Sequence, residues 1–520
     1  MSQSYKSLTD RFHRIAQIDH ANFVMGWDQM VMMPPGGVEA RGTAVAELRS
    51  MRHELLTQDD MSDLLDGAEA ELSGLEPDKQ AVQVVSIAEM RRSWLQASAI
   101  PASLVKAKVL AGTRCEHAWR TQRTENDWDG FLVNFKEVVA LSREEARCRQ
   151  AASATGFDTP YDALLDLYCA GDSQALIGDV FTSLKDRLPA LLERVMEHQK
   201  VEGSQQASSS SSLSSAPLSS LTGPFAVDSQ IELSQRLMSR PGFDFQSGRL
   251  DVSMHPFSTG VAGDQRITTR FRETDIADAL QATAHETGHA SYESGLPAQY
   301  RGLPVGGSRN MCLHESQSLL FEKHLFLSLP FLEAFINDVH EVFPNTAGFG
   351  AREFWQSQTK VEPTFVRVEA DEVTYPMHVM LRYDIESALI NGSIEPDVIP
   401  EVWDSAMKEY LGLSTGGDHL KGCLQDIHWT DGSFGYFPSY TMGAINAAQI
   451  AASIKEAFPD WQERWRGGDI HFLRDWLSTN LWQKGSFKSS QELMQSMTGS
   501  GSQADSFIAH LEARYLQHEY

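Results

Sequence analysis

The segment HETGH, residues 285–289, places two histidines four positions apart with a glutamate directly after the first. Residues four apart lie on one face of an α-helix, so the imidazoles of His285 and His289 can bind one metal ion from the same side. Glu286 projects beside that ion as a candidate base for a bound water. In a chain with 17 histidines this spacing also arises by chance, so the motif alone leaves a metal site and an accident of composition equally open.

The sequence around the motif, TDIADALQATAHETGHASYESGLP, predicts the helix that would carry it. Asp275 is the expected N-terminal cap, and Ile276 and Leu280 form an apolar stripe on one face. Gly295 and Pro297 are expected to end the helix.

A catalytic zinc ion usually has three protein ligands and one open position, so the motif needs a third ligand. The metzincin arrangement is excluded, because Tyr292 and Gly295 occupy the positions where that class has a glycine and a third histidine. Glu293 follows on the same helix, but it lies roughly 12 Å along the axis from His285, too far to share an ion. The third ligand must therefore come from another element.

The next predicted helix, SRNMCLHESQSLLFEKHLF, offers two carboxylates, Glu315 and Glu322, and begins at Ser308 as its expected cap. The interval after the second histidine is long enough for a turn and an antiparallel return helix, which favours Glu315 as the ligand. A solvated surface glutamate is the other interpretation. His314 and Gln317 flank Glu315 and are candidates for orienting the ligands from outside.

The elements that position these residues are predicted to be mainly helical. Apolar residues recur at helical spacing near the N-terminus, at Leu8, Phe12, Ile15 and Phe23. From about residue 38 to residue 203 the chain mixes Ala, Leu, Glu, Lys and Arg with few turn signals, which indicates long helices packed on one another. We expect a large helical fold in a single domain, residues 1–520.

Two segments depart from the helical pattern. The serine-rich stretch at residues 204–224 has almost nothing to bury and predicts a loop inserted within the domain, with a domain linker as the alternative. Residues 248–260 and 264–271 are rich in β-branched and aromatic side chains and predict a β-hairpin, with Gly260 and Gly263 at its turn.

Composition limits the function. The formal net charge of −26 makes the chain a poor partner for nucleic acid or anionic lipid, because its field repels phosphate. The five cysteines are scattered and form no C-x-x-C pair, which suits a reducing compartment better than a disulfide framework. With neither a secretory signal nor an apolar run of membrane length, the chain is expected to be cytoplasmic, with no membrane partner.

Several blocks together resemble one known family. HETGH followed by HESQS is similar to the carboxypeptidase Taq family of zinc metallocarboxypeptidases. Further matching blocks stand in the same order: WDQMVMMPPGG at 27–37, HPF at 255–257, DQRIT at 264–268, VRVEAD at 366–371 and GCLQDIHW at 422–429. The likeness spans nearly the whole chain. Val366 departs from it, since the family often has isoleucine there, and the serine-rich stretch is similar to an insertion.

The resemblance implies a helical fold with a deep groove, one metal ion, removal of C-terminal residues from peptides, and a homodimer. It also implies that His285, His289 and Glu315 are the metal ligands and that Glu286 is the catalytic acid and base. Zinc is the expected ion, and two histidines with a carboxylate also accept cobalt or manganese.

Peptide hydrolysis needs a donor for the developing oxyanion besides the metal. The segment HWTDGSFGYFPSY supplies Tyr436, Tyr440 and His428 as candidates. The glycines around Tyr436 indicate a loop near the groove and favour this residue. A tyrosine of the core or the rim is the alternative.

A carboxypeptidase must also bind the terminal carboxylate, which arginine does best through a bidentate pair. Arg367 in VRVEAD is the first candidate, because the resemblance implies that this block lies at the closed end of the groove. Arg266 in DQRIT is the second, with a structural pair to Asp264 as its alternative role. His255 and His378 are candidate lining residues, and a buried structural histidine is the alternative for each.

Three other functions are weighed against the carboxypeptidase. A helical zinc endopeptidase would have the same metal site in a groove open at both ends. An aminopeptidase would need acidic groups for the substrate's amine, and the sequence offers no such block near the site. A non-catalytic peptide-binding scaffold would be expected to lose Glu286 or a ligand, and all four positions are intact.

Overall fold

The computed structural model describes residues 3–153, 156–208 and 223–518, without side chains at 203–208. The serine-rich stretch therefore lies largely outside the described residues, and its loop character stays a prediction. Its first residues are an exception. Residues 204–208 continue helix α8, so the predicted loop does not begin at residue 204.

The fold is mainly helical, as predicted. The longer helices, in chain order, are α1 (Gln3–Val31), α2 (Val38–Leu56), α3 (Met61–Ala70), α4 (Pro77–Ser98), α5 (Ala102–Gln122), α6 (Trp128–Ala152), α7 (Pro160–Leu165), α8 (Gln174–Ser208), α9 (Val227–Ser239), α10 (Ala277–Gly295), α11 (Met311–Leu319), α12 (Leu329–Val342), α13 (Ala351–Gln358), α14 (Tyr375–Ile390), α15 (Ile399–Leu411), α16 (Pro438–Ala457), α17 (Trp461–Arg466), α18 (His471–Asn480), α19 (Ser490–Thr498) and α20 (Asp505–Leu516). Within the described ranges, no helix is long and apolar enough to cross a membrane.

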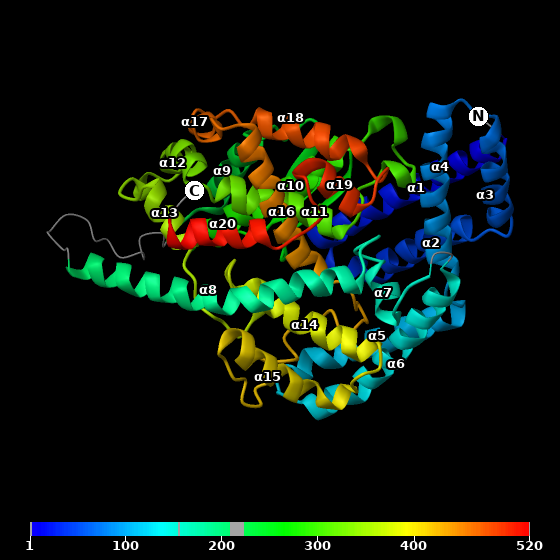
Figure 1. The fold of residues 1–520 in the computed structure, drawn as a ribbon, viewed down its shortest axis with the longest axis horizontal. Coiled ribbons are helices and arrows are strands. Elements are labelled where there is room, and N and C mark those ends of the chain that lie inside the picture. The colour runs from blue at the N-terminus through cyan, green and yellow to red at the C-terminus, as the bar shows by residue number, and fades with distance from the viewer. Residues whose placement is uncertain (1–2, 154–155, 209–222, 519–520) are drawn as a thin grey trace.

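Helix α8 runs across the middle of the molecule in Figure 1, with α5, α6, α14 and α15 on one side of it. Helices α1 to α4 gather at one end, and the C-terminal helix α20 lies along α8 on the other side. The first helix, α1, and the last helix, α20, therefore lie in different parts of the molecule.

The apolar core consists of three large clusters, and α16 joins two of them. One cluster is formed mainly by α5 to α8, α14, α15 and α20, a second by α9 to α13 and α17 to α19, and a third by α1 to α4. Helix α16 contributes Met442 and Ile445 to the first cluster and Ala447 and Ile450 to the second. Most of α16 from Pro438 to Ala451 is buried, and this helix packs directly against α11.

The predicted stripe near the N-terminus is largely confirmed. Leu8, Phe12 and Ile15 of α1 are buried in the third cluster. Phe23 is 43% exposed, so the prediction is wrong for that residue.

The β-structure is a three-stranded sheet, formed by β1 (Gly248–Val252), β2 (Phe257–Val261) and β3 (Asp264–Thr269) in the order β1–β3–β2. Strands β2 and β3 form the predicted hairpin, with Gly260 at φ +117° and Gly263 at φ +100°. The prediction of a single strand at 248–260 is wrong, because this segment forms two strands, β1 and β2. Strand β1 pairs parallel with β3. Pro256 has no N–H to donate to a ladder, which accounts for the break.

Candidate metal centre and active site

Helix α10 carries the HETGH motif and ends at Gly295, as predicted. The cap position is Ile276, one residue later than predicted, although Oδ1 of Asp275 still accepts a hydrogen bond from the amide of Ala277 at 2.8 Å. The following helix, α11, begins later than expected. Its cap is Asn310, whose side chain accepts a hydrogen bond from the amide of Leu313, so the prediction of Ser308 is wrong.

Two glycines allow α10, α11 and α16 to approach one another closely. A Cβ atom on Gly288, inside the motif, would lie 2.4 Å from the carbonyl oxygen of Gln317 on α11. A Cβ atom on Gly443 of α16 would lie 2.6 Å from Cγ of Glu315. Real atoms cannot come so close, so both positions require glycine if the helices are to hold Glu315 beside the histidines.

Three predicted ligands converge. The Nε2 atom of His289 lies 3.5 Å from Oε2 of Glu315, and Nε2 of His285 lies 3.9 Å from Oε1 of the same carboxylate. One ligand atom from each of the three residues lies within 4.8 Å of the others. An ion about 2.0–2.2 Å from each ligand fits between atoms at these separations.

The charges around the histidines favour a cation. Burial lowers the pKa of His285, but the carboxylates of Glu315 and Glu322 outweigh this effect and raise the pKa to about 9. Burial, together with the positive charge of His314 and His285, lowers the pKa of His289 well below its usual value. His289 therefore keeps a free lone pair at neutral pH, while the position of His285 attracts either a proton or a metal ion.

Glu322, the second carboxylate weighed in the sequence, lies on the other side of His285. Its Oε2 atom is 2.8 Å from Nδ1 of His285, the ring nitrogen that faces away from Glu315. Glu322 belongs to a π-helical segment, η6 (Leu320–Phe326), which continues α11. A carboxylate on this nitrogen fixes the tautomer and orientation of a ligating histidine, so Glu322 is suited to orient the ligand and Glu315 to bind the ion.

The two residues that flank Glu315 have different surroundings. His314 stacks on His289 with ring centroids 4.5 Å apart, and its Nε2 atom lies 2.9 Å from Oε1 of Glu293. It therefore holds His289 from the side, as predicted. Gln317 accepts a hydrogen bond from the indole N–H of Trp482 and contacts the core, so it does not orient a ligand.

The site opens into a cavity of about 590 Å³. Six of the predicted site residues line it: His285, Glu286, His289, Glu315, Tyr436 and Tyr440. Five others do not: Arg367, Arg266, His255, His378 and His428. The structure therefore brings together the metal ligands, the acid/base candidate and two oxyanion candidates, Tyr436 and Tyr440, and leaves the predicted substrate residues behind or beyond the wall.

Glu286 is 6% exposed and lies at the cavity wall. Burial raises the pKa of its carboxyl group to about 7, partly offset by the positive charge of His285. A carboxyl group of this kind can both accept and release a proton near neutral pH, as a general acid and base must.

Arg367 is 5% exposed, and its guanidinium is held from two sides. Its Nη2 atom donates to Oδ1 of Asp426 at 2.8 Å, and its Nη1 atom donates to the hydroxyl of Tyr375 at 2.6 Å. Tyr375 lines the cavity, and Arg367 lies behind it. Tyr375 therefore stands between this arginine and the cavity.

Arg266 and His255 belong to the sheet. Arg266 forms a bidentate pair with Asp264, at 2.9 and 3.1 Å, and its guanidinium lies 4.4 Å from the ring centroid of Trp27. This is the structural role weighed as its alternative. His255 is exposed between β1 and β2, while the next residues, Pro256 and Phe257, line the cavity.

The remaining aromatic candidates form one wall. Tyr436 and Tyr440 line the cavity, and the ring of Tyr436 stacks on His428 at 5.4 Å.

Burial lowers the pKa of His428 to about 4 and that of His378 to about 3, and nearby arginines add to the lowering for both. Both imidazoles are neutral at neutral pH. His378 is fully buried, which agrees with the alternative of a buried structural histidine.

Sequence reasoning missed two residues at this site. Lys323 lines the cavity, and its ammonium lies 2.6 Å from Oε1 of Glu322. Tyr375 presents a hydroxyl that Arg367 contacts from behind. Lys323 directly follows a candidate ligand, a signal that could have been used, whereas the role of Tyr375 depends on long-range packing.

Comparison with known proteins gives the same picture along the whole chain. Residues 7–515 match the family model of the Carboxypeptidase Taq (M32) metallopeptidases. Thermostable carboxypeptidase 1 of Thermus thermophilus is 34% identical, over 98% of this chain and 98% of that protein. Carboxypeptidase 1 of Bacillus subtilis is 29% identical, over 98% of this chain and 97% of that protein. The solved structure of Trypanosoma cruzi metallocarboxypeptidase 1 has a TM-score of 0.92 and 36% identity, covering 99% of both chains.

The fold and the convergent His285, His289 and Glu315 define a helical metallopeptidase. The matches cover nearly the whole length of this chain and of its relatives. The chain belongs to the carboxypeptidase Taq (M32) family and is a metallocarboxypeptidase. The family predicted from the sequence blocks is confirmed. Its members are carboxypeptidases, so this function is favoured over a zinc endopeptidase and a non-catalytic scaffold.

Proposed function

We propose that His285, His289 and Glu315 bind one divalent ion, with zinc as the first candidate and cobalt or manganese as alternatives. One observation carries the proposal: three ligand atoms from two helices lie within 4.8 Å of one another at the wall of a cavity of about 590 Å³. Two imidazoles and a carboxylate, with a position left open, are the donors of catalytic zinc peptidases. When bound, the ion would polarise the scissile carbonyl and lower the pKa of a water molecule.

Glu286 is the proposed general base and acid. Its carboxylate lies at the same wall, directly after the first ligand on α10. It would take a proton from the attacking water and deliver it to the leaving amine. Burial excludes bulk solvent from this carboxylate, so the proton passes to the amine rather than to the medium.

Tyr436 is the proposed donor to the oxyanion. Its ring lies in the cavity wall, and its hydroxyl is a donor in a partly buried site, where a hydrogen bond to a developing charge counts most. His428 stacks behind this ring and acts as a positioning residue. Tyr440, on the same wall, is the alternative donor.

For the terminal carboxylate we propose a relay in which Arg367 acts through Tyr375. The hydroxyl of Tyr375 accepts a hydrogen bond from Arg367, so its own proton is free to donate into the cavity. Burial raises the pKa of Tyr375 to about 12 in spite of the neighbouring guanidinium, so the hydroxyl stays protonated at neutral pH. Lys323 is the alternative cation, since it lines the cavity directly. Arg266, His255 and His378 lie outside the lining and have weaker support as substrate residues.

The test compares peptides with free and amidated C-termini. Tyr375→Phe and Arg367→Ala should each lower kcat/KM for free peptides by more than tenfold, since a contact to a charged group contributes roughly 1.5–3 kcal/mol. Amidated peptides, which lack the charge, should be poor substrates of every variant. Tyr375→Phe is the gentler change, because it keeps the ring and leaves Arg367 paired with Asp426.

Lys323→Ala tests the alternative cation, and Arg266→Ala is the matched control. If Lys323→Ala removes the preference for free ends and Tyr375→Phe does not, the relay is wrong and the lysine binds the carboxylate. If the unaltered protein cleaves free and amidated peptides equally well at internal bonds, the carboxylate site itself is wrong.

We further propose a homodimer of single-domain subunits in a reducing compartment such as the cytoplasm. The family match over residues 7–515 supports one domain. Val105 and Val109, one turn apart on α5, are 40% and 63% exposed and offer apolar surface for a partner. All five cysteines are free thiols in the structure, consistent with a reducing compartment. Light scattering coupled to gel filtration tests the dimer.

A further inference from the structure

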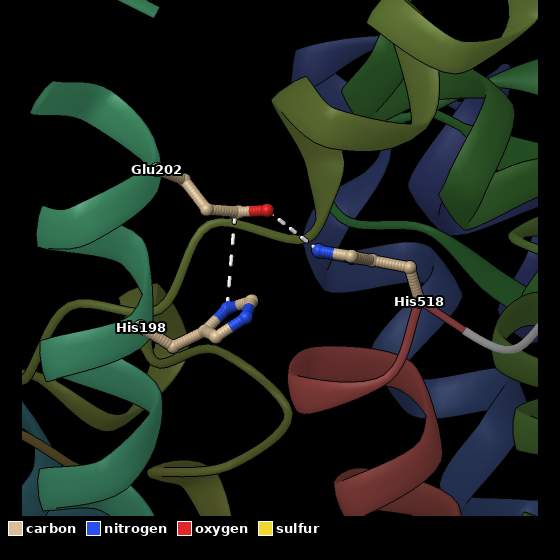
Figure 2. Close-up of side chains that lie close together, drawn as sticks. All are labelled: His198, Glu202 and His518. Carbon is tan, nitrogen blue, oxygen red and sulfur yellow. Dashed lines mark hydrogen bonds and ion pairs between the residues drawn. The ribbon is translucent and has the colours of Figure 1, made fainter. Parts of the chain in front are cut away.

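Outside the active site, a second group of metal-ligand side chains joins helix α8 to the C-terminal segment. His198 and Glu202 stand one turn apart on α8, and His518, which follows α20, faces them from the opposite side (Figure 2). The Nε2 atom of His518 lies 2.7 Å from Oε1 of Glu202, and Nδ1 of His198 lies 3.8 Å from Oε2. One ligand atom from each residue lies within 4.8 Å of the others.

The Nδ1 atom of His198 has no hydrogen-bond partner among the described residues, although it is buried and faces Glu202. A buried polar atom without a partner is rare in native proteins and calls for a ligand, a water or an ion. The unpartnered nitrogen is explained if the three side chains are gathered around an ion.

From this geometry we propose that His198, Glu202 and His518 bind a second divalent ion, of the zinc class. Two imidazoles and one carboxylate are typical zinc donors, and ions of this class bind such donors at about 2.0–2.2 Å. The three side chains are 31–39% exposed, which leaves an entry path and room for water to complete the coordination. None of the three lines the catalytic cavity.

A similar trio, His324, Glu372 and His510, illustrates why donor type alone does not define a cation site. Both oxygens of Glu372 are engaged there, one by His510 and the other by Arg514 and Tyr515. The guanidinium would repel an incoming cation. In the trio of His198, Glu202 and His518, no lysine or arginine contacts Glu202 among the ion pairs of the described residues.

The proposed ion would link His518 of the C-terminal segment to α8 and so stabilise their contact. The two helices already pack on each other, with surface ion pairs from Arg187 to Asp505 and from Arg194 to Glu512. Exposed ion pairs contribute little, about 0–1 kcal/mol each. An ion bound by residues more than 300 positions apart in the chain would stabilise this contact in proportion to its free concentration.

The experiment counts zinc bound to the full-length protein at buffered free zinc, by elemental analysis after gel filtration. The unaltered protein should bind two equivalents per chain, and His285→Ala/His289→Ala should retain one. Adding His518→Ala to that double variant should remove the remaining equivalent. His471→Ala, which removes an exposed histidine of α18, is the matched control and should change nothing.

A second measurement separates a real site from loss of folding. Zinc should raise the melting temperature of His285→Ala/His289→Ala, and it should not do so once His198 or His518 is also replaced. His518→Ala alone should keep full peptidase activity, since His518 does not line the catalytic cavity. The proposal is overturned if the unaltered protein binds only one equivalent, or if the variants at 198, 202 and 518 all retain two.

Discussion

Replacing Glu322 tests how the metal centre is organised, because the structure separates the carboxylate that binds the ion from the one that orients a ligand. Glu322 contacts Nδ1 of His285 at 2.8 Å, on the ring side opposite Glu315. Glu322→Ala removes this contact and leaves the His285 ring free to rotate. Loss of such an orienting carboxylate typically weakens metal binding by about 10–100-fold. That range corresponds to roughly 1.4–2.8 kcal/mol.

Two companion variants give an order of effects. Glu322→Gln keeps an oxygen that can accept from Nδ1–H and removes only the charge, so it should weaken binding less than Glu322→Ala. Glu315→Ala removes a ligand outright and should weaken binding most. The expected order of dissociation constants is therefore unaltered protein, then Glu322→Gln, then Glu322→Ala, then Glu315→Ala.

The assay titrates each metal-free variant with zinc against a chromophoric chelator of known affinity, so activity is not the readout. Circular dichroism of each variant checks that the helices remain. If Glu322→Ala loses more affinity than Glu315→Ala, Glu322 is the ligand and the assignment is reversed. If Glu322→Ala binds zinc as tightly as the unaltered protein, the hydrogen bond to His285 does not contribute and the reasoning fails.

Three more predictions concern turnover, packing and acid stability. Glu286→Gln should retain bound metal but lower kcat by about 10²–10⁴-fold, measured by metal analysis and peptide cleavage together. Gly443→Ala should destabilise the fold by about 1–3 kcal/mol and weaken metal binding, because its methyl group would displace Glu315; Gly26→Ala, where nothing lies within 4 Å, is the control in both denaturation and titration. Glu372→Gln should cost about 3–5 kcal/mol at neutral pH. Burial opposes ionisation of Glu372, but the guanidinium of Arg514 and the imidazole of His510 hold the pKa of its carboxyl group well below the usual value. The stability that the ionised carboxylate contributes is therefore lost as the pH falls below about 4.3. Over that range the free energy of urea unfolding should fall less steeply for Glu372→Gln than for the unaltered protein.

Local geometry made the histidine pair and its glutamate predictable. A spacing of four places two side chains on one helical face whatever the rest of the chain does. Spacing alone was a weaker guide between Glu315 and Glu322, because they lie two helical turns apart on one continuous segment. Packing at Gly288 and Gly443 decides how that segment approaches α10, and a sequence pattern does not contain this information.

Non-local pairing accounts for most of the remaining errors. The hairpin of β2 and β3 follows from neighbouring sequence, whereas the parallel pairing of β1 with β3 depends on how the chain returns. Arg367 was identified by its block, but its partner Asp426 lies 59 positions away, and the pair buries the guanidinium. The cap of α11 was missed for a local reason, since Ser308 and Asn310 are both good capping residues and the helix begins at the second.

The buried charges around Asp426 bear on how the enzyme binds a carboxylate. Arg367 and Arg382 both pair with this single aspartate, so the three residues carry one net positive charge behind the aromatic wall. Asp264 and Arg266, by contrast, form a neutral pair and have no charge to offer a ligand. We infer that Tyr375, held by Arg367, hydrogen-bonds the terminal carboxylate of a peptide, and that the positive charge behind the wall favours free C-termini in a protein whose overall charge of −26 repels anions.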